Sequence, residues 1–162
     1  MNQAPFDIGD MHKRAVVETV RLILDRKGGD LISISPTASV YEAIAEMARA
    51  QVGALLVLVN HELVGIVSER DYARKVILQG RSSNSTRVEE IMTPSPITVE
   101  PDATVDECMR IITEQRIRHL PVVKDGDVKG IVSIGDLVKA IISAQSYTIE
   151  RLHTYIATDY PS

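Results

Sequence analysis

Apolar residues follow two different spacings along this 162-residue chain, and the order of those spacings occurs twice. In residues 40–47 and 105–112 they recur every three or four positions, which predicts two helices that each bury one face. Each of these segments is followed by two short runs rich in Val, Ile and Leu, which predict paired strands. These runs are residues 54–59 and 62–68 in the first half and 120–124 and 128–133 in the second.

Polar residues mark where the elements begin and turn. Each predicted helix starts at a capping box, in which a hydroxyl and a carboxylate satisfy backbone N–H groups. These boxes are Ser39 with Glu42 and Thr104 with Glu107. The paired runs are separated at residues 60–61 and 125–126, where Asn and Gly tolerate the positive φ of a tight hairpin. With a short strand before and a second helix after, each half predicts the order β-α-β-β-α.

The two halves are copies of one unit. A shift of 65 positions, as from Gly65 to Gly130, superimposes them without a gap and keeps several identities in place. The identical pairs include Pro36 and Pro101, Leu55 and Leu120, Ser68 and Ser133, and Asp71 and Asp136. One unit of about 50 residues is too small to bury its apolar face alone. We therefore expect a mixed α/β (α+β) fold in which two units pack sheet to sheet about a pseudo-twofold axis.

The same pattern divides the chain into five segments. We expect a mobile N-terminal segment at 1–19, the first repeat at 20–80, a polar linker at 81–90, the second repeat at 91–145 and a C-terminal helix and tail at 146–162. The last segment carries an apolar stripe at helical spacing, made of Ile149, Leu152, Tyr155 and Ile156. Such a stripe packs more often on its own domain or on a second subunit than on a membrane.

Composition and charge narrow the function. A formal net charge of −4 and a pI near 5.6 argue against nucleic-acid binding, which needs a basic face. No apolar run approaches the roughly 18 residues of a membrane span, and the first residues lack the pattern of a secretory signal. The single cysteine, Cys108, predicts a small buried side chain, and the four histidines lack the spacing of metal ligands. We expect a cytoplasmic protein without a metal site, a nucleic-acid partner or a membrane partner.

The candidate chemistry lies where the third strand of each unit runs into its second helix. Ser68 and Asp71 occupy this junction in the first unit, and Ser133 and Asp136 occupy it in the second. A Ser-x-x-Asp pair can cap a helix, but the capping boxes of this chain use Glu, which favours another use for the shorter Asp. A carboxylate there can accept hydrogen bonds from a diol, and a helix start favours a nearby anion. The residues alone leave capping and a sugar-phosphate site both open.

The duplicated pattern, with R-H-L-P-V-V at 118–123 and G-I-V-S-x-x-D at 65–71 and 130–136, resembles the CBS domain family. The pair resembles a Bateman module, in which two CBS units pack around two clefts, and the likeness covers about residues 20–145. Members of that family bind AMP, ADP, ATP, S-adenosylmethionine or dinucleotides such as NAD(H) in those clefts. The resemblance therefore implies an adenosine-containing regulatory ligand and no catalytic cofactor.

The resemblance also implies roles for individual residues. The ribose hydroxyls would be held by Ser68 and Asp71 in one cleft and by Ser133 and Asp136 in the other. Backbone groups of the first and third strands would border the adenine. These border positions are Ser33, Ser35, Thr37, Ile66 and Val67 in the first unit and Thr98, Glu100, Asp102, Ile131 and Val132 in the second.

The two units differ at positions that matter for phosphate. Arg70 precedes the first Asp, where the second unit has glycine, and Arg118 and His119 stand where the first unit has only Gly and Ala. Because contacts from arginine to phosphate are charge-assisted, we expect a phosphate in the cleft that receives Arg70, with Arg118 or His119 reaching in from the other unit. A solvated surface charge is the alternative for each. The first unit also departs from the family pattern at Leu56, where the second has Pro121.

Three functions fit these observations. The first is a regulatory module, not an enzyme, that senses cellular energy or redox state through AMP, ADP, ATP or NAD(H) and signals to an unidentified regulated protein. The second, an enzyme acting on nucleotides, is disfavoured because the chain has no G-x-x-x-x-G-K-[ST] or G-x-G-x-x-G loop and no nucleophile–base pair. The third is a structural dimerisation module with empty clefts. Apolar helix faces predict a homodimer in any case.

Overall fold

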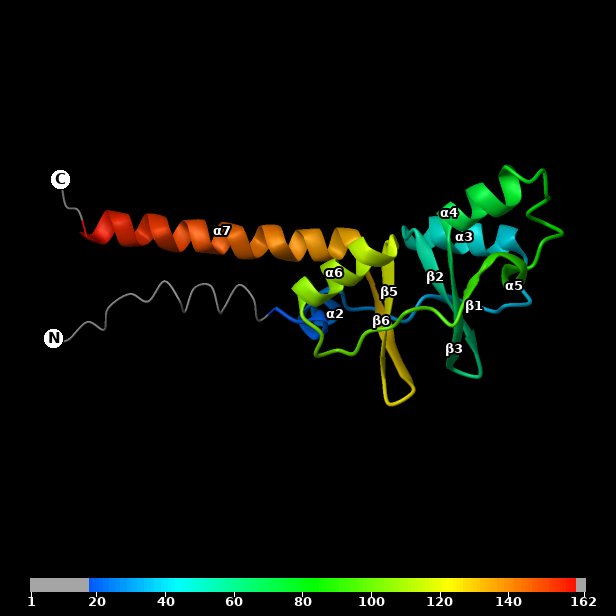
Figure 1. Cartoon of the computed structure of the whole chain (residues 1–162), viewed down its shortest axis with the longest axis horizontal. Coiled ribbons are helices and arrows are strands. Elements are labelled where there is room, and N and C mark those ends of the chain that lie inside the picture. The colour runs from blue at the N-terminus through cyan, green and yellow to red at the C-terminus, as the bar shows by residue number, and fades with distance from the viewer. Residues whose placement is uncertain (1–17, 160–162) are drawn as a thin grey trace.

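The computed structural model describes residues 18–159, and the predicted order of elements occurs twice in it (Figure 1). The first repeat contains β1 (Ser33–Ile34), α3 (Val40–Ala50), β2 (Ala54–Val59), β3 (Glu62–Ser68), α4 (Glu69–Tyr72) and the π-helical segment η1 (Ala73–Ile77). The second contains α6 (Val105–Gln115), β5 (His119–Lys124), β6 (Asp127–Ser133) and α7 (Ile134–Asp159). Between or before them lie α2 (Val20–Lys27), α5 (Val88–Ile91) and β4 (Thr93–Pro94). The expected mobile segment, residues 1–19, lies outside the described residues except for its last two positions.

The strands form one sheet in each half. The first sheet has the order β1-β2-β3-β4, in which β1 is parallel to β2 and the other neighbours are antiparallel. In the second half β5 and β6 are antiparallel, and Val99 adds a parallel bridge to Val122. Both hairpins turn through residues with positive φ, at 60–61 (49° and 66°) and 125–126 (52° and 80°). The hairpins predicted from the sequence are therefore confirmed, as is the mixed α/β class.

Helices α3 and α6 begin at the predicted capping boxes. Glu42 N donates to Ser39 Oγ at 3.1 Å while Ser39 N donates to the Glu42 carboxylate at 3.0 Å, and Thr104 and Glu107 make the same pair of bonds. Each helix then buries the predicted face. These buried residues are Val40, Ala43 and Met47 in α3 and Val105, Cys108 and Ile112 in α6. Burial raises the pKa of the Cys108 thiol to about 11, so this cysteine stays protonated.

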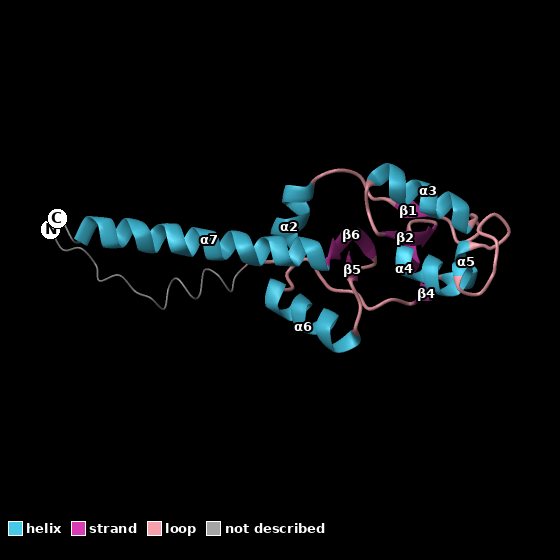
Figure 2. Cartoon of the chain, turned by 90° about the horizontal axis from the view of Figure 1, so that it is seen from above, coloured by secondary structure: helices cyan, strands magenta, loops and turns pink. Residues whose placement is uncertain are grey.

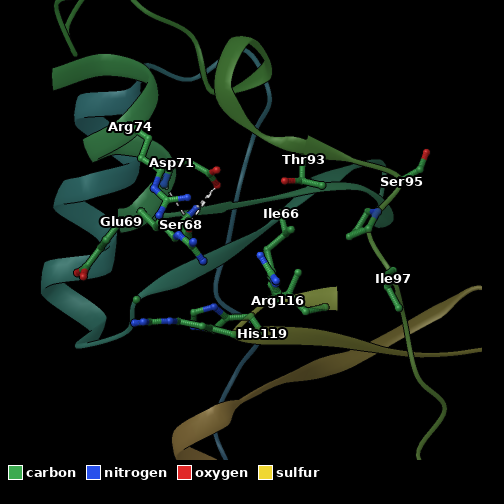
Figure 3. A pocket seen from close by; sticks show the side chains of 15 residues that line it. Ile66, Ser68, Glu69, Asp71, Arg74, Thr93, Ser95, Ile97, Arg116 and His119 are labelled. Atoms are coloured by element: carbon green, nitrogen blue, oxygen red, sulfur yellow. Dashed lines mark hydrogen bonds between the residues drawn. The ribbon is translucent and has the colours of Figure 1, made fainter. Parts of the chain in front are cut away.

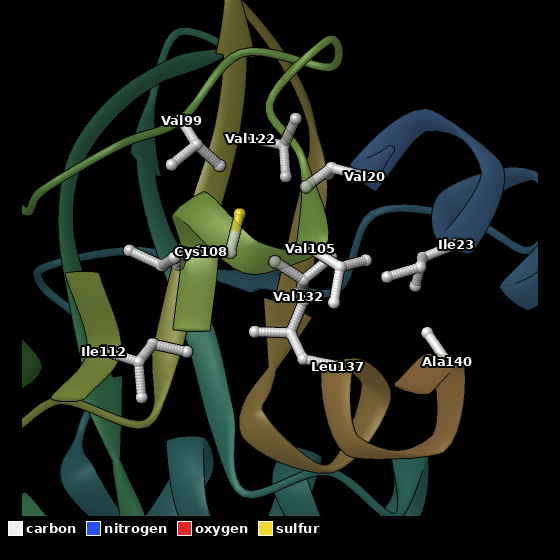
Figure 4. Packing of buried hydrophobic residues seen from close by; sticks show 11 residues of the cluster. Val20, Ile23, Val99, Val105, Cys108, Ile112, Val122, Val132, Leu137 and Ala140 are labelled. Carbon is white, nitrogen blue, oxygen red and sulfur yellow. The ribbon is translucent and has the colours of Figure 1, made fainter. Parts of the chain in front are cut away.

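Each repeat is completed by a helix that the chain places before the other repeat. α2 precedes the first repeat, yet Val20 and Ile23 belong to the core of the second (Figure 4). α5 precedes the second repeat, yet Val88 and Ile91 belong to the core of the first. In Figure 2, α2, α6 and α7 accordingly surround β5 and β6, while α3, α4 and α5 surround the first sheet. The two helices are exchanged between the repeats.

The exchanged helices make matching hydrogen bonds. Val20 N donates to Ala103 O at 2.9 Å, and Val88 N donates to Ala38 O at 2.9 Å. The shift from Val20 to Val88 is 68 positions, whereas Ala38 and Ala103 follow the shift of 65 that relates the rest of the repeats. The range expected for the first repeat, 20–80, therefore includes a helix of the second core, and the expected linker runs into a helix of the first.

The last helix extends well beyond the body of the molecule. α7 is 26 residues long, and Figure 1 shows its distal part projecting away from the two sheets. Its first turns pack in the second core through Leu137 and Ala140. Further along, the large apolar residues are exposed, namely Ile142, Ile149, Leu152 and Ile156. Within residues 18–159, no helix has the length and apolar character needed to cross a bilayer.

Candidate functional site

Both predicted Ser–Asp junctions are present, and both cap a helix. Ser68 N donates to Asp71 Oδ2 at 2.9 Å, and Asp71 N donates to Ser68 Oγ at 3.2 Å. Ser133 and Asp136 make the same two bonds at 2.9 and 3.1 Å. Capping, one of the two uses that the residues alone left open for the shorter Asp, is therefore present at both junctions. Ser68 keeps extended strand geometry (φ −127°, ψ 163°) as it caps the helix, and with this backbone the Asp side chain is long enough to close the box.

Capping does not use up the carboxylate of Asp71. Its Oδ2 accepts from Ser68 N and from Ser68 Oγ at 3.0 Å, while its Oδ1 lies 3.2 Å from Lys75 Nζ. A carboxylate has about four acceptor positions, so at least one remains. Asp71 also lines a cleft, which means that this acceptor is within reach of a ligand. Capping and ribose binding are thus compatible at this residue.

The cleft beside Asp71 has a volume of about 520 Å³ and is walled by both repeats (Figure 3). Most of its lining comes from the strand–helix junction at 68–74, from the chain at 93–97 and from the start of β5 at 116–119. Ile66 and Ile97 add apolar surface. Cavities of a few hundred cubic ångströms with apolar walls and a few converging polar groups are typical of small-molecule sites.

Four arginines line this cleft. Arg70 and Arg74 come from α4 and η1, and Arg116 and Arg118 come from the second repeat just before β5. Among residues 18–159, these four form no ion pair with a carboxylate. The lining holds only two carboxylates, so the cleft carries excess positive charge in a chain whose net charge is −4. The arrangement is suited to an anion.

His119 lies between the two junctions. Burial lowers the pKa of the imidazole, and the positive charges of Lys27 and Arg118 lower it further. The negative charges of Asp136 and Asp71 raise the pKa but do not offset burial, so the pKa lies below its usual value. The imidazole is therefore neutral at neutral pH and can accept a hydrogen bond at one nitrogen. Its ring also faces Gly53, where an added Cβ would lie 3.7 Å from His119 Nε2.

Several sequence-predicted residues meet in this one cleft. They are Ile66, Ser68, Arg70, Asp71, Arg118 and His119. In particular, Arg70 and Arg118 lie in the same cleft although they belong to different repeats, as the sequence predicted. The ligand contacts assigned to these residues stay predictions.

Other predicted residues lie elsewhere. Val67 and Val132 point into the two cores, with 1% and 0% exposure, because successive residues of a strand face opposite sides. Ser133 and Asp136, at the second junction, also lie outside the lining of this cleft. The other predicted positions outside it are Ser33, Ser35, Thr37, Thr98, Glu100, Asp102 and Ile131. Among these, Ser35 Oγ is hydrogen-bonded to Thr37 Oγ1 at 3.0 Å, and Asp102 pairs with Arg21 at 3.0 Å.

Sequence reasoning missed other lining residues. Arg74 follows Arg70 by one helical turn, and Arg116 precedes Arg118 by two positions, so a search for cations near the motif would have found both. Thr93, Ser95 and Ile97 gave no such signal. Their place in the wall depends on the pairing of β4 with β3, which spans only two residues.

The second junction has a different surrounding. Lys27 Nζ donates to Asp136 Oδ2 at 2.8 Å and to Ile131 O at 3.0 Å. Burial alone would raise the pKa of Asp136, but the hydrogen bonds from Lys27 and Ser133 N hold that pKa below its usual range. No group of three or more potential metal ligands occurs in the described part of the chain.

Comparison with known proteins decides the family. The model of the CBS domain matches residues 21–77 and 88–143, which together make up more than half of the chain. The chain belongs to the CBS domain family. This CBS pair is 42% identical over 151 residues to the CBS domain-containing protein CBSX3, mitochondrial, of Arabidopsis thaliana, and the match covers 88% of this chain and 73% of the relative.

Solved structures of other CBS pairs have the same fold. A protein with CBS domains from Burkholderia ambifaria is 51% identical with a TM-score of 0.74, and the match covers 77% of this chain and 94% of that one. The CBS domain protein PAE2072 from Pyrobaculum aerophilum, solved in complex with AMP, is 29% identical with a TM-score of 0.66. That match covers 73% of this chain and 88% of the other.

Proposed function

We propose that this CBS pair is a regulatory module, not an enzyme, that binds an adenine nucleotide in the cleft beside Asp71. The observation that carries the proposal is the set of four arginines without carboxylate partners, which face the same cleft as the Ser68–Asp71 junction. The AMP complex of the Pyrobaculum relative supports adenosine as the ligand class. AMP, ADP, ATP and NAD(H) all fit this description, so energy or redox state is the proposed input.

Each group in the cleft has a proposed contact. Asp71 accepts hydrogen bonds from the ribose hydroxyls, since its carboxylate keeps a free acceptor position after capping. Arg70 and Arg118 hold the phosphate from opposite repeats, with Arg74 and Arg116 beside them. Neutral His119 also lines the cleft and adds no positive charge of its own at neutral pH.

The cleft is suited to regulation because the ligand would bridge the two repeats. Residues 68–74 belong to the first repeat and residues 116–119 to the second, so bound phosphate would fix their relative position. A ligand shifts such an equilibrium only by its difference in affinity for the two arrangements. The partner that responds is a separate, unidentified protein, and the proposed location is the cytoplasm, although the Arabidopsis relative is named as mitochondrial.

A second copy of the chain is the other proposed partner. Exposed apolar residues on α7 recur at seven-residue intervals, at Ile142, Ile149 and Ile156. Two more lie on the same stripe, Val138 four residues before Ile142 and Leu152 three residues after Ile149. This spacing is that of a coiled coil, and we propose two strands for it. A structural dimerisation module with an empty cleft would use the same helix, but it would leave the four arginines of the cleft without a function.

A titration panel tests the proposal. Adenosine, AMP, ADP, ATP, NAD and NADH are added to the full chain, and the melting temperature is followed. A ligand present at 100 times its Kd adds about 2.7 kcal/mol of stability, which corresponds to a rise on the order of 5 to 10 °C for a chain of this size. The absence of any rise with all six compounds would leave the structural module as the better account.

A further inference from the structure

We propose that Lys27 closes the second cleft of the pair, so that one chain binds one nucleotide, at the Asp71 junction only. This inference rests on the proposed function, because it divides nucleotide binding unequally between the two junctions. Its basis is the pair of hydrogen bonds from Lys27 Nζ to Asp136 Oδ2 at 2.8 Å and to Ile131 O at 3.0 Å. The ammonium group of Lys27 therefore pairs with the carboxylate that is equivalent to Asp71.

The repeat symmetry shows that Lys27 replaces something. In the first repeat, the edge of β3 is covered by β4, where Ile66 pairs with Thr93. In the second repeat, the equivalent residue is Ile131, and the group bound to its carbonyl is Lys27 Nζ. The described part of the second repeat has no strand equivalent to β4. Lys27 thus lies at the edge of β6 that corresponds to the edge of β3 covered by β4 in the first repeat.

The difference arises from helix length. α5 ends at Ile91 and the chain turns into β4, whereas α2 continues for one more turn to Lys27. With the shift of 68 positions that relates these helices, the counterpart of Lys27 is Ser95, which lines the open cleft. The short, neutral side chain of Ser95 in the first repeat therefore corresponds to the long, cationic side chain of Lys27 in the second.

Lys27 is held in place by the packing of its helix. Val20 and Ile23 are buried in the second core, and Leu24 lies so close to Gly130 that an added Cβ there would be 2.9 Å from Leu24 Cδ2. The helix then ends at Gly28, whose φ of 59° turns the chain away directly after Lys27. The lysine is the last residue of an anchored helix, and its side chain is only 38% exposed.

Asp71 also has a lysine partner, but that contact is of another kind. Lys75 is one turn along the same helical segment, approaches Oδ1 at 3.2 Å and donates to Ile91 O at 2.8 Å. It does not line the cleft, whereas Asp71 does. Lys27 reaches Asp136 from a separate helix, and ribose hydroxyls would have to displace it from a charge-assisted bond.

Calorimetric titration of the full chain with ATP and with AMP tests this inference. We expect one site per chain in the wild type, at least tenfold weaker binding in Asp71→Asn, and unchanged binding in Asp136→Asn. In Lys27→Met a second site should appear, giving two per chain, and the double variant Lys27→Met with Asp136→Asn should return to one. Lys129→Met, which removes an exposed lysine from β6, is the matched control and should keep one site.

Other outcomes overturn the inference. The inference is contradicted by two sites in the wild type or by one site in Lys27→Met. It is also contradicted by weaker binding in Lys27→Met, because Lys27 would then be a ligand contact. All three results leave nucleotide binding itself intact. If Lys27→Met does not fold, as judged by circular dichroism, Lys27→Gln replaces it with the same expectation. Failure of the proposed function is distinguishable, because the wild type and every variant would then show no heat of binding with either nucleotide.

Discussion

Gly53 and Arg118 hold equivalent positions in the two repeats, and their carbonyl groups make the same bond. Gly53 O accepts a hydrogen bond from Glu69 N at 3.0 Å, and Arg118 O accepts one from Ile134 N at 2.9 Å. Each bond ties the segment after α3 or α6 to the first residue of the next helix. The backbone frame is therefore duplicated, while the side chain that faces the cleft differs between the copies.

Replacement of Arg118 or Arg70 by alanine should weaken the binding of phosphorylated ligands specifically. A charge-assisted hydrogen bond contributes about 1.5–3 kcal/mol, so the Kd for ATP should rise roughly ten- to a hundredfold, while that for adenosine changes little. Calorimetry with both compounds measures the difference. Arg110→Ala, at an exposed position of α6, is the control and should leave both values unchanged. Equal losses for adenosine and ATP would contradict a phosphate contact.

The two equivalent glycines Gly65 and Gly130 should both resist replacement by alanine, for different reasons. At Gly65 an added Cβ would lie 2.6 Å from Met92 Sδ and 3.0 Å from Thr93 O, whereas at Gly130 its close neighbours are atoms of the Leu24 side chain. Because a backbone carbonyl yields little, Gly65→Ala should lose about 1–3 kcal/mol through steric contact. Gly130→Ala should lose a comparable amount for another reason, since the φ of Gly130 is 158°, a conformation that residues with a side chain rarely adopt. Gly65→Ala should also weaken ATP binding, since β4 leads into the cleft wall. Urea unfolding and calorimetry measure both effects, and a Gly65→Ala variant with unchanged stability and unchanged ATP binding would refute the contact with β4.

Alanine at Ile23 should destabilise the protein as much as alanine at Ile91. These residues are 5% and 1% exposed and lie in opposite cores, so each truncation should cost about 2–5 kcal/mol in urea unfolding. Leu78→Ala, at a residue 75% exposed and outside both cores, should change stability by about 0.5 kcal/mol or less. A neutral effect of Ile23→Ala would mean that α2 is not part of the second core.

The low pKa of His119 predicts a loss of stability in mild acid. Its pKa in the folded state lies below the value of about 6.5 in the unfolded chain, so the unfolded state takes up the proton first as the pH falls. The contribution of neutral His119 to the free energy of unfolding is fully present above pH 6.5. It is lost as the pH falls through that value towards the folded-state pKa. Urea midpoints between pH 8 and 5 should therefore fall less in His119→Gln than in the wild type. His61→Asn, at an exposed hairpin residue, should retain the wild-type slope.

The apolar stripe of α7 predicts an effect on oligomeric state. Leu152→Lys or Ile149→Lys would place a charge in the proposed coiled-coil seam, and the mass measured by light scattering should fall from that of a dimer to that of a monomer. His153→Lys, at an exposed neighbouring position, should leave the dimer intact. A wild-type chain that is monomeric at all accessible concentrations would exclude this role for the helix.

Local patterns in the sequence were sufficient for most of the fold. The capping boxes at Ser39 and Thr104 and the two hairpins depend on residues close together in the chain, and each lies at its predicted place. The exchange of α2 and α5 was not predictable in this way. Those helices follow a shift of 68 rather than 65 positions, and each packs against residues that are distant in sequence, as Val20 does with Ala103.

The site was predictable where it coincides with a motif and not where it depends on tertiary pairing. Ser68 and Asp71 belong to the repeated junction, and comparing the two repeats drew attention to Arg70 and Arg118. Lys27 carried no sequence signal, since nothing in its neighbourhood indicates that the end of α2 reaches the second junction. A lysine near the start of a chain is ordinarily a solvated charge, and only the packing of its helix brings it to Asp136.

The exchanged helices impose an order on folding during synthesis. The buried residues of the first core lie between Val40 and Ile91, so that core can close as soon as α5 has been made. The second core reaches from Val20 to Ala140, which leaves the apolar face of α2 uncovered until nearly the whole pair has been translated. The first half should therefore fold while translation continues. Helix α2, although it is synthesised first, should be among the last elements to dock.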